Sequence, residues 1–134
     1  FDVFQKAMEL LQKDNHNIAP VILSNNGRPY SEVPLVMNAC DVLVLTSDSE
    51  GSPTVIKEAM ACNLPIVSVD VGDVAEVIRN TANCYICKQD PADIAERIRL
   101  VLSEDIRTTG RNNIKHLSSK KIIKELVGLY RKIA

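Results

Sequence analysis

The sequence predicts an α/β fold in which a parallel sheet carries helices on both faces. Two short apolar runs, "DVLVLTS" from Asp41 and "PIVSVD" from Pro65, have the composition of strands buried on both faces. Segments with apolar residues at helical spacing separate these runs, and strands that alternate with helices indicate a parallel sheet. The chain has 134 residues, 46% of them hydrophobic, which suffices for one core but not for two domains of usual size. We therefore expect residues 1-134 to form one domain.

The N-terminal part is expected to contain two helices and one strand. Apolar residues recur at helical spacing from Phe1 and predict a helix that ends at about Lys13. Residues 18–23 have the composition of a short buried strand, and the turn-forming residues 25–29 predict a loop after it. Residues 33–40 are again helical in their spacing. Because Phe1 already stands inside a helical pattern, we expect the chain to be part of a longer protein.

Capping residues bound the helix that follows "DVLVLTS". Ser52 is a favoured N-cap and Pro53 suits the first helical position, so a helix should begin there. Asn63 tolerates the left-handed conformation of a C-terminal cap, which places the end of this helix near it.

A capping pair is also predicted after "PIVSVD". Asp73 and Glu76 form an approximate capping box for a helix that would continue to Asn80. The following "NCYICK" has the composition of the last strand.

Helices are predicted to complete the chain. One should cover residues 91–102, and two more should be separated by a break near Gly110, with a restart at Ser118 or Ser119. Four strands are few for a sheet with helices on both faces, so we expect the first strand or two of the complete domain to be missing.

Positive charge is concentrated at the C-terminal end. The net charge is −1, yet residues 107–134 carry eight basic residues and one acidic residue, a local charge of about +7. Such a segment is most often solvated helix surface, and it can also meet nucleic acid, an anionic membrane or an acidic neighbouring domain. No apolar run is long enough to cross a bilayer. We expect a cytoplasmic protein without a nucleic-acid partner, with peripheral contact to the inner face of the membrane left open.

The four cysteines are predicted to be reduced thiols. Cys40 and Cys62 each follow an alanine at the end of a helical pattern, where free cysteine behaves as a small hydrophobe. Cys84 and Cys87 stand three apart on a predicted strand, so their side chains point to opposite faces, and no second Cys or His pair completes a zinc set. We expect neither a metal site nor a redox motif.

A strand-to-helix loop, residues 47–54, carries the strongest candidate site. Glu50 precedes the helix, and Glu58 lies about 7.5 Å further along the helix axis than Pro53. The helix N-terminus between the two carboxylates suits an anion, and Gly51 leaves room for a ligand. Carboxylate, anion site and carboxylate together fit a ligand with hydroxyls at both ends and phosphates between them, such as a nucleotide-sugar.

A structural role explains the same residues about equally well on spacing alone. An acidic residue near a helix N-terminus stabilises the helix dipole by about 0.3 to 1 kcal/mol when exposed. Glu58 could also form an ion pair with a neighbouring Lys or Arg.

The segment "EGSPTVIKEAMACNLPIVSVDVGDVAEVI" resembles the donor-binding segment of retaining glycosyltransferases of the glycosyl transferases group 1 family, where E-G-x-x-x-x-x-x-E-A-M-A precedes a strand and D-V-G. The preceding "EVPLVMNACDVLVLTS" and the later "DPADIAERIRLVL" are similar to the elements that flank this segment in the family. The resemblance covers about residues 32–130. It implies a Rossmann-like C-terminal, donor-binding domain of the two-domain GT-B architecture, of which this chain would be a part.

The resemblance implies a role for each site residue. Glu50 would hold hydroxyls of the donor sugar as the catalytic residue of this half, and Glu58 would accept hydrogen bonds from the ribose hydroxyls. The diphosphate would bind at the backbone around Ser52, Pro53, Thr54 and Val55, beside Gly51, although Pro53 has no amide to donate.

Four features depart from the family pattern, the first being Pro53, which stands where many members have Gly. Asp73 replaces the second glycine of D-V-G-G, and Asn63 replaces a frequent glycine after the helix. The chain is shorter than usual before Glu32, so base contacts are placed only loosely, at Leu23, Ser24 or Asn25.

The reaction implied is transfer of a sugar from a nucleotide-diphosphate-sugar to an acceptor hydroxyl, with retention and with no metal or other cofactor. Its partners would be the donor and an N-terminal acceptor domain absent from this chain, so the fragment alone should be inactive. Three alternatives stay open: a sugar-nucleotide epimerase on the same scaffold, a receiver-like signalling module, and a divalent metal at Asp48-Ser49-Glu50.

Overall fold

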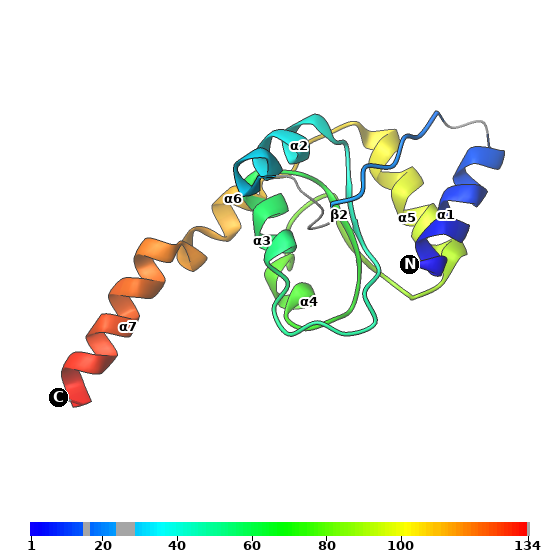
Figure 1. The fold of residues 1–134 in the computed structure, drawn as a ribbon. Helices are drawn as coiled ribbons and strands as arrows, with labels where there is room; N and C mark the ends of the chain where they lie inside the picture. Colours follow the sequence, from blue (N-terminus) through cyan, green and yellow to red (C-terminus); the bar gives the residue numbers. More distant parts are fainter. Residues whose placement is uncertain (15–16, 24–28, 134) are drawn as a thin grey trace.

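The computed structural model describes residues 1–14, 17–23 and 29–133, and in these residues the sheet is parallel and has three strands (Figure 1). The strands are β1 (Leu43–Leu45), β2 (Ile66–Val69) and β3 (Cys84–Cys87), in that spatial order. The helices are α1 (Asp2–Lys13), α2 (Val33–Ala39), α3 (Thr54–Ala61), α4 (Val74–Val77), α5 (Pro91–Glu104), α6 (Gly110–Asn113) and α7 (Ser119–Ile133), and the 3-10 turns are η1 (Tyr30–Glu32) and η2 (Lys115–Leu117). The predicted α/β class with a parallel sheet is confirmed.

β2 is the central strand, and all four of its residues are buried. In the register, Val67 stands opposite Val44 of β1 and opposite Tyr85 of β3. Because side chains alternate along a strand, Val67 and Val69 enter one hydrophobic cluster and Ile66 enters another on the opposite face. The helices therefore cover both faces of the sheet, as the sequence predicts.

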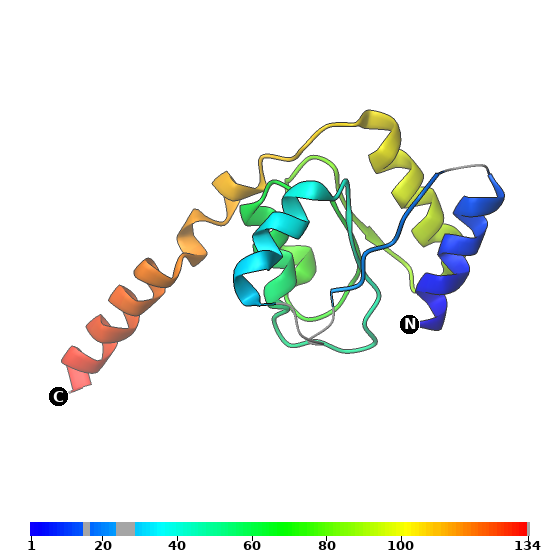
Figure 2. The same cartoon turned by 45° about the horizontal axis from the view of Figure 1, so that its top comes forward.

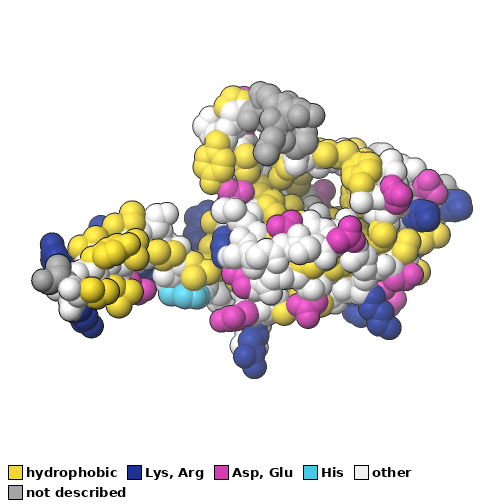
Figure 3. All heavy atoms as spheres, turned by 60° about the horizontal axis from the view of Figure 1, so that its bottom comes forward, with side chains coloured by type: hydrophobic (Ala, Val, Ile, Leu, Met, Phe, Trp, Pro, Cys, Tyr) yellow, Lys and Arg dark blue, Asp and Glu magenta, His cyan; other side chains and the backbone are white. Residues whose placement is uncertain are grey.

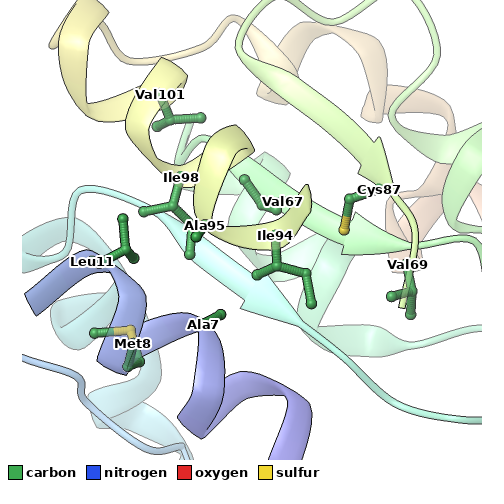
Figure 4. Packing of buried hydrophobic residues seen from close by; sticks show 10 residues of the cluster. All are labelled: Ala7, Met8, Leu11, Val67, Val69, Cys87, Ile94, Ala95, Ile98 and Val101. Carbon is green, nitrogen blue, oxygen red and sulfur yellow. The ribbon is translucent and has the colours of Figure 1, made fainter. Parts of the chain in front are cut away.

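Helices α1 and α5 lie side by side and cover one face (Figures 1 and 2). Figure 4 shows their apolar residues gathered over β2 and the end of β3. The buried members of this cluster are Ala7, Met8, Leu11, Val67, Val69, Cys87, Ile94, Ala95, Ile98 and Val101. The apolar residues that recur at helical spacing from Phe1 thus form the face of α1 that packs against the sheet and α5.

Helices α2, α3 and α4 supply the cluster on the other face. Its buried members are Met37, Ile56, Ala59, Met60, Leu64, Ile66, Val74 and Ile78. The fully buried residues of α3 in this cluster hold the helix that carries Glu58 against the sheet.

The strand predicted over residues 18–23 is wrong. These residues are described, and none of them belongs to a strand or a helix. Ile18 packs against the cluster of α1 and α5 while Leu23 packs against the opposite cluster, so the segment passes from one face to the other. Pro20 lacks the N–H that a ladder needs, and the predicted burial is not found either, since Val21 and Ile22 are 51% and 55% exposed. Of the loop predicted over residues 25–29, only Pro29 lies within the described residues.

β1 is less buried than predicted, since its three residues are half-buried. Among the described elements it pairs with β2 alone, so its other edge has no strand beside it.

The end of α3 agrees with prediction. Asn63 has φ of 53°, the left-handed conformation expected after the helix. Arg107 donates hydrogen bonds to the carbonyls of Met37 and Cys40 at the end of α2 and to that of Cys62 at the end of α3. A single guanidinium therefore ties the C-terminal ends of these two helices together.

α7 projects from the rest of the chain (Figures 1 and 2). It begins at Ser119, as predicted, but Gly110 is not a break, because it is the first residue of α6 and the chain is non-helical just before it, at residues 105–109. Figure 3 shows hydrophobic side chains along its surface. The exposed apolar residues of α7 are Ile122, Ile123, Leu126, Val127, Leu129, Tyr130 and Ile133. Nothing among the described residues covers this apolar face.

Candidate functional site

The loops that follow β1 and β2 meet in front of α3. Gly72, in the second loop, has φ of +56°. A Cβ atom added to it would lie 2.2 Å from the carbonyl oxygen of Gly51 and 2.9 Å from that of Glu50. The two backbones therefore approach so closely that only glycine fits at this position.

A polar network fixes the same loops to α3. Lys57 Nζ donates to both carboxylate oxygens of Asp73, at 2.8 and 3.0 Å, and to Ser52 Oγ at 2.7 Å. Ser52 in turn donates to Asp73 at 2.8 Å. Burial raises the pKa of Asp73, but the hydrogen bonds from Lys57 and Ser52 outweigh that effect and hold the pKa below its ordinary value. The carboxylate therefore stays ionised at neutral pH and keeps the network intact.

This network explains two wrong predictions. Ser52 does not cap α3, because its hydroxyl is occupied by Asp73 and Lys57; the helix begins at Thr54, with Pro53 in extended conformation before it. Asp73 makes no side-chain cap to α4, which ends at Val77 instead of reaching Asn80. In both cases Lys57 of α3 offers the side chain a charged partner, which is stronger than a backbone amide.

The two candidate glutamates have different surroundings. Glu58, on α3, accepts a hydrogen bond from the hydroxyl of Tyr30 in η1, with 2.5 Å between the oxygens. This bond, followed by the charge of Glu58, raises the pKa of Tyr30. Glu50 is exposed in the loop, and its carboxylate has no partner among the described residues. Neither glutamate forms an ion pair with a described Lys or Arg, so the ion pair considered for Glu58 is not found.

The remaining predicted site residues lie in the loop before α3 and in its first turn, with the start of the helix one residue later than predicted. Gly51 and Ser52 are exposed in the loop, Pro53 is buried, and Thr54 and Val55 open α3. Among these, the first residues of α3 have backbone amides that the helix itself leaves without a partner. The site thus consists of a helix N-terminus with one carboxylate before it and one on its second turn.

A cavity of about 620 Å³ lies beside this site, at the carboxyl ends of β2 and β3. Its lining includes Asp48, Asp70, Lys88 and Arg97, but neither Glu50 nor Glu58. Gln89 donates to Asp48 at 2.5 Å, which links the cavity wall to the loop after β1. The predicted carboxylates are therefore not part of the lining of this cavity.

The described residues contain no group of three or more His, Cys, Asp or Glu side chains arranged to hold a metal ion. All four cysteines are free. Burial raises the pKa of Cys84 and of Cys87 to about 11, so neither thiol is activated as a nucleophile.

Sequence reasoning missed Tyr30 and Lys57. The sequence offered one signal for Lys57, which stands five residues after Ser52 and directly before Glu58 on α3. The sequence offered no signal for Tyr30, because its contact with Glu58 joins residues 28 positions apart and forms only in the folded chain.

Comparison with known proteins identifies relatives over most of the chain. A family model described as Glycosyl transferases group 1 matches residues 2–121. An uncharacterized glycosyltransferase of Methanocaldococcus jannaschii is 35% identical over 95 residues, which are 69% of this chain and 27% of that protein. A putative teichuronic acid biosynthesis glycosyltransferase of Bacillus subtilis is 35% identical over 78 residues, 58% of this chain and 20% of that protein.

A third relative is the N,N'-diacetylbacillosaminyl-diphospho-undecaprenol alpha-1,3-N-acetylgalactosaminyltransferase of Campylobacter jejuni. It is 31% identical over 98 residues, 69% of this chain and 26% of that protein. The chain spans about a quarter of the length of these relatives. No solved structure matches it.

Proposed function

Because this chain belongs to the glycosyl transferases group 1 family, we propose that it is the donor-binding part of a glycosyltransferase. The protein transfers a sugar from a nucleotide-diphosphate-sugar to an acceptor hydroxyl, with retention and without a required metal. In this proposal the acceptor site lies in an N-terminal domain outside the residues of this chain. This chain alone binds the donor and does not transfer the sugar.

One feature carries the proposal: the N-terminus of α3 lies in the chain between Glu50, in the loop before the helix, and Glu58, on its second turn. The Lys57–Asp73 pair and the close approach of Gly72 to Gly51 hold the loop in front of that helix. A diphosphate placed at the helix N-terminus would receive amide hydrogen bonds and the positive end of the helix dipole. Glu58 would then accept from the ribose on one side, and Glu50 from the sugar on the other.

Catalysis by this part of the protein is electrostatic. Negative charge develops on the diphosphate as the bond to the sugar breaks, and amides fixed in advance stabilise that charge without reorganising. Glu50 holds the sugar hydroxyls so that the anomeric carbon faces the acceptor.

The names of the relatives favour this function over the alternatives. Those of Methanocaldococcus jannaschii, Bacillus subtilis and Campylobacter jejuni are named as glycosyl- or acetylgalactosaminyltransferases, which does not favour an epimerase or a signalling receiver. The acidic pair that a receiver needs would fall at residues 24–26, and the sequence there is Ser-Asn-Asn, which supplies none.

Titration calorimetry with ADP, GDP, CDP and UDP tests the proposal. We expect one of them to bind the chain, and Glu58→Ala to weaken that binding about tenfold to a hundredfold, since hydrogen bonds to a charged group contribute about 1.5 to 3 kcal/mol. Glu96→Ala is the matched control, because Glu96 is an exposed glutamate on α5. If no nucleoside diphosphate binds, or if both variants bind as the parent does, the proposal is wrong.

Contact with the inner face of the cytoplasmic membrane is a further part of this proposal. Every helix in the described residues is too short or too polar to span a bilayer. The exposed apolar face of α7, with Lys120, Lys124 and Arg131 on the opposite side, has the character of a helix that lies in an anionic membrane surface. We expect the chain to sediment with anionic vesicles and to stay in the supernatant with zwitterionic ones. If the chain stays in the supernatant to the same extent with both kinds of vesicle, this contact is excluded.

A further inference from the structure

Tyr30 presents an aromatic ring to solvent at the edge of the donor site. It belongs to the short turn η1, and 74% of its surface is exposed. Its hydroxyl donates to Glu58 Oε1 at 2.5 Å. The ring is therefore held beside Glu58 at one end, while its faces are open.

The bond to Glu58 leaves that carboxylate able to bind a ligand. A carboxylate offers about four acceptor positions on two oxygens, and Tyr30 uses one of them, on Oε1. The hydroxyl of Tyr30 is protonated at neutral pH, and the bond to Glu58 raises its pKa further, so it remains a donor. Tyr30 thus orients Glu58 without displacing a second hydrogen-bond donor.

The position of the ring relative to a nucleotide follows from ordinary nucleoside geometry. In a nucleoside, the base is attached to the carbon next to the one that carries the 2′-hydroxyl. If Glu58 holds the ribose hydroxyls, the base lies within a few ångströms of that carboxylate, on the side of the ribose away from the diphosphate. An aromatic ring tethered to the same carboxylate is then within reach of the face of the base.

We propose that Tyr30 is the nucleobase platform of the donor site and that its ring stacks on the base of the nucleoside diphosphate. This inference rests on the proposed function, and it adds a base contact to those expected at residues 23–25. Stacking on one ring tolerates any base, so Tyr30 supplies affinity while other groups select the base.

Two substitutions separate the ring from the hydroxyl. Tyr30→Phe keeps the ring, so we expect nucleoside diphosphate binding within about threefold of the parent. Tyr30→Leu removes the ring, and we expect binding to weaken about tenfold, the scale of one lost base–aromatic stack. Inorganic pyrophosphate, which has no base, should bind the parent and both variants equally.

Tyrosine fluorescence reports the stack directly, because the chain has no Trp and three Tyr residues. In a Tyr85→Phe, Tyr130→Phe chain, Tyr30 is the sole emitter, and the nucleoside diphosphate that binds should quench it with the dissociation constant found by calorimetry. A Tyr30→Phe, Tyr85→Phe chain, which emits from Tyr130, is the matched control for absorption by the nucleotide and should show no saturable quenching.

The outcomes distinguish this inference from the proposed function. If a nucleoside diphosphate binds in a Glu58-dependent way but Tyr30→Leu binds it as the parent does, or Tyr30 is not quenched, Tyr30 is not the platform and the proposed function stands. If no nucleoside diphosphate binds at all, both are wrong. Equal weakening by Tyr30→Phe and Tyr30→Leu would assign the effect to the hydroxyl and overturn the stacking.

Discussion

Replacing Gly72 by alanine is expected to lower the free energy of unfolding by about 3 kcal/mol or more. The left-handed conformation, with φ of +56°, costs a non-glycine residue about 1 to 3 kcal/mol. The added methyl group would also lie 2.2 Å from the carbonyl oxygen of Gly51, and such overpacking adds about 1 to 3 kcal/mol. The loop in front of α3 must then move, so nucleoside diphosphate binding should be lost as well. Denaturant unfolding followed by circular dichroism measures the first effect, and calorimetry the second.

Gly51→Ala is the matched control for this prediction. A Cβ atom at Gly51 would meet nothing within 4 Å, so the free energy of unfolding should change by about 0.5 kcal/mol at most. If the donor approaches this backbone closely, the same variant should still bind it more weakly. Equal stability of Gly72→Ala and Gly51→Ala would mean that the two loops do not meet as described.

The second large effect is expected for Ile56→Ala, which should cost about 2 to 5 kcal/mol of stability. Ile56 is fully buried in the cluster formed by α2, α3 and α4. Its loss would leave a cavity beneath the first turn of α3, whose amides are proposed to bind the diphosphate. Thermal unfolding of the variant is the measurement, and Ile56→Val should lose about 0.5 to 1.5 kcal/mol.

Ile123→Ala provides the comparison on an exposed surface. Ile123 is 59% exposed on α7, so this variant should unfold within about 0.5 kcal/mol of the parent. A cost at Ile123 as large as that at Ile56 would show that the apolar face of α7 is covered in solution.

Sequence patterns predicted best what the local chain determines by itself. The apolar spacing of α1, the buried strand β2 and the left-handed Asn63 all depend on neighbouring residues, and the structure confirms them. The family was also predictable, because the sequence around Glu50 and Glu58 resembles the family over a long continuous stretch, and the family model matches residues 2–121. The α/β class was predictable with it.

Predictions that needed a distant partner failed. Residues 18–23 have a strand-like composition, but no strand pairs with them. Ser52 and Asp73 were predicted as helix caps, and Lys57 engages both instead. Tyr30 could not be assigned to the site from the sequence because its contact with Glu58 exists only in the folded chain.

The central claim is that the N-terminus of α3, between two carboxylates, binds a nucleotide-sugar. Chemical-shift mapping of the ¹⁵N-labelled chain, titrated with the nucleoside diphosphate that binds and then with its sugar conjugate, tests this most directly. We expect the amides of Glu50, Gly51, Thr54 and Glu58 to shift in a saturable way, with Glu50 responding more strongly to the sugar conjugate. Shifts confined to the basic residues 107–133 would instead indicate nonspecific attraction of phosphate and would contradict the account.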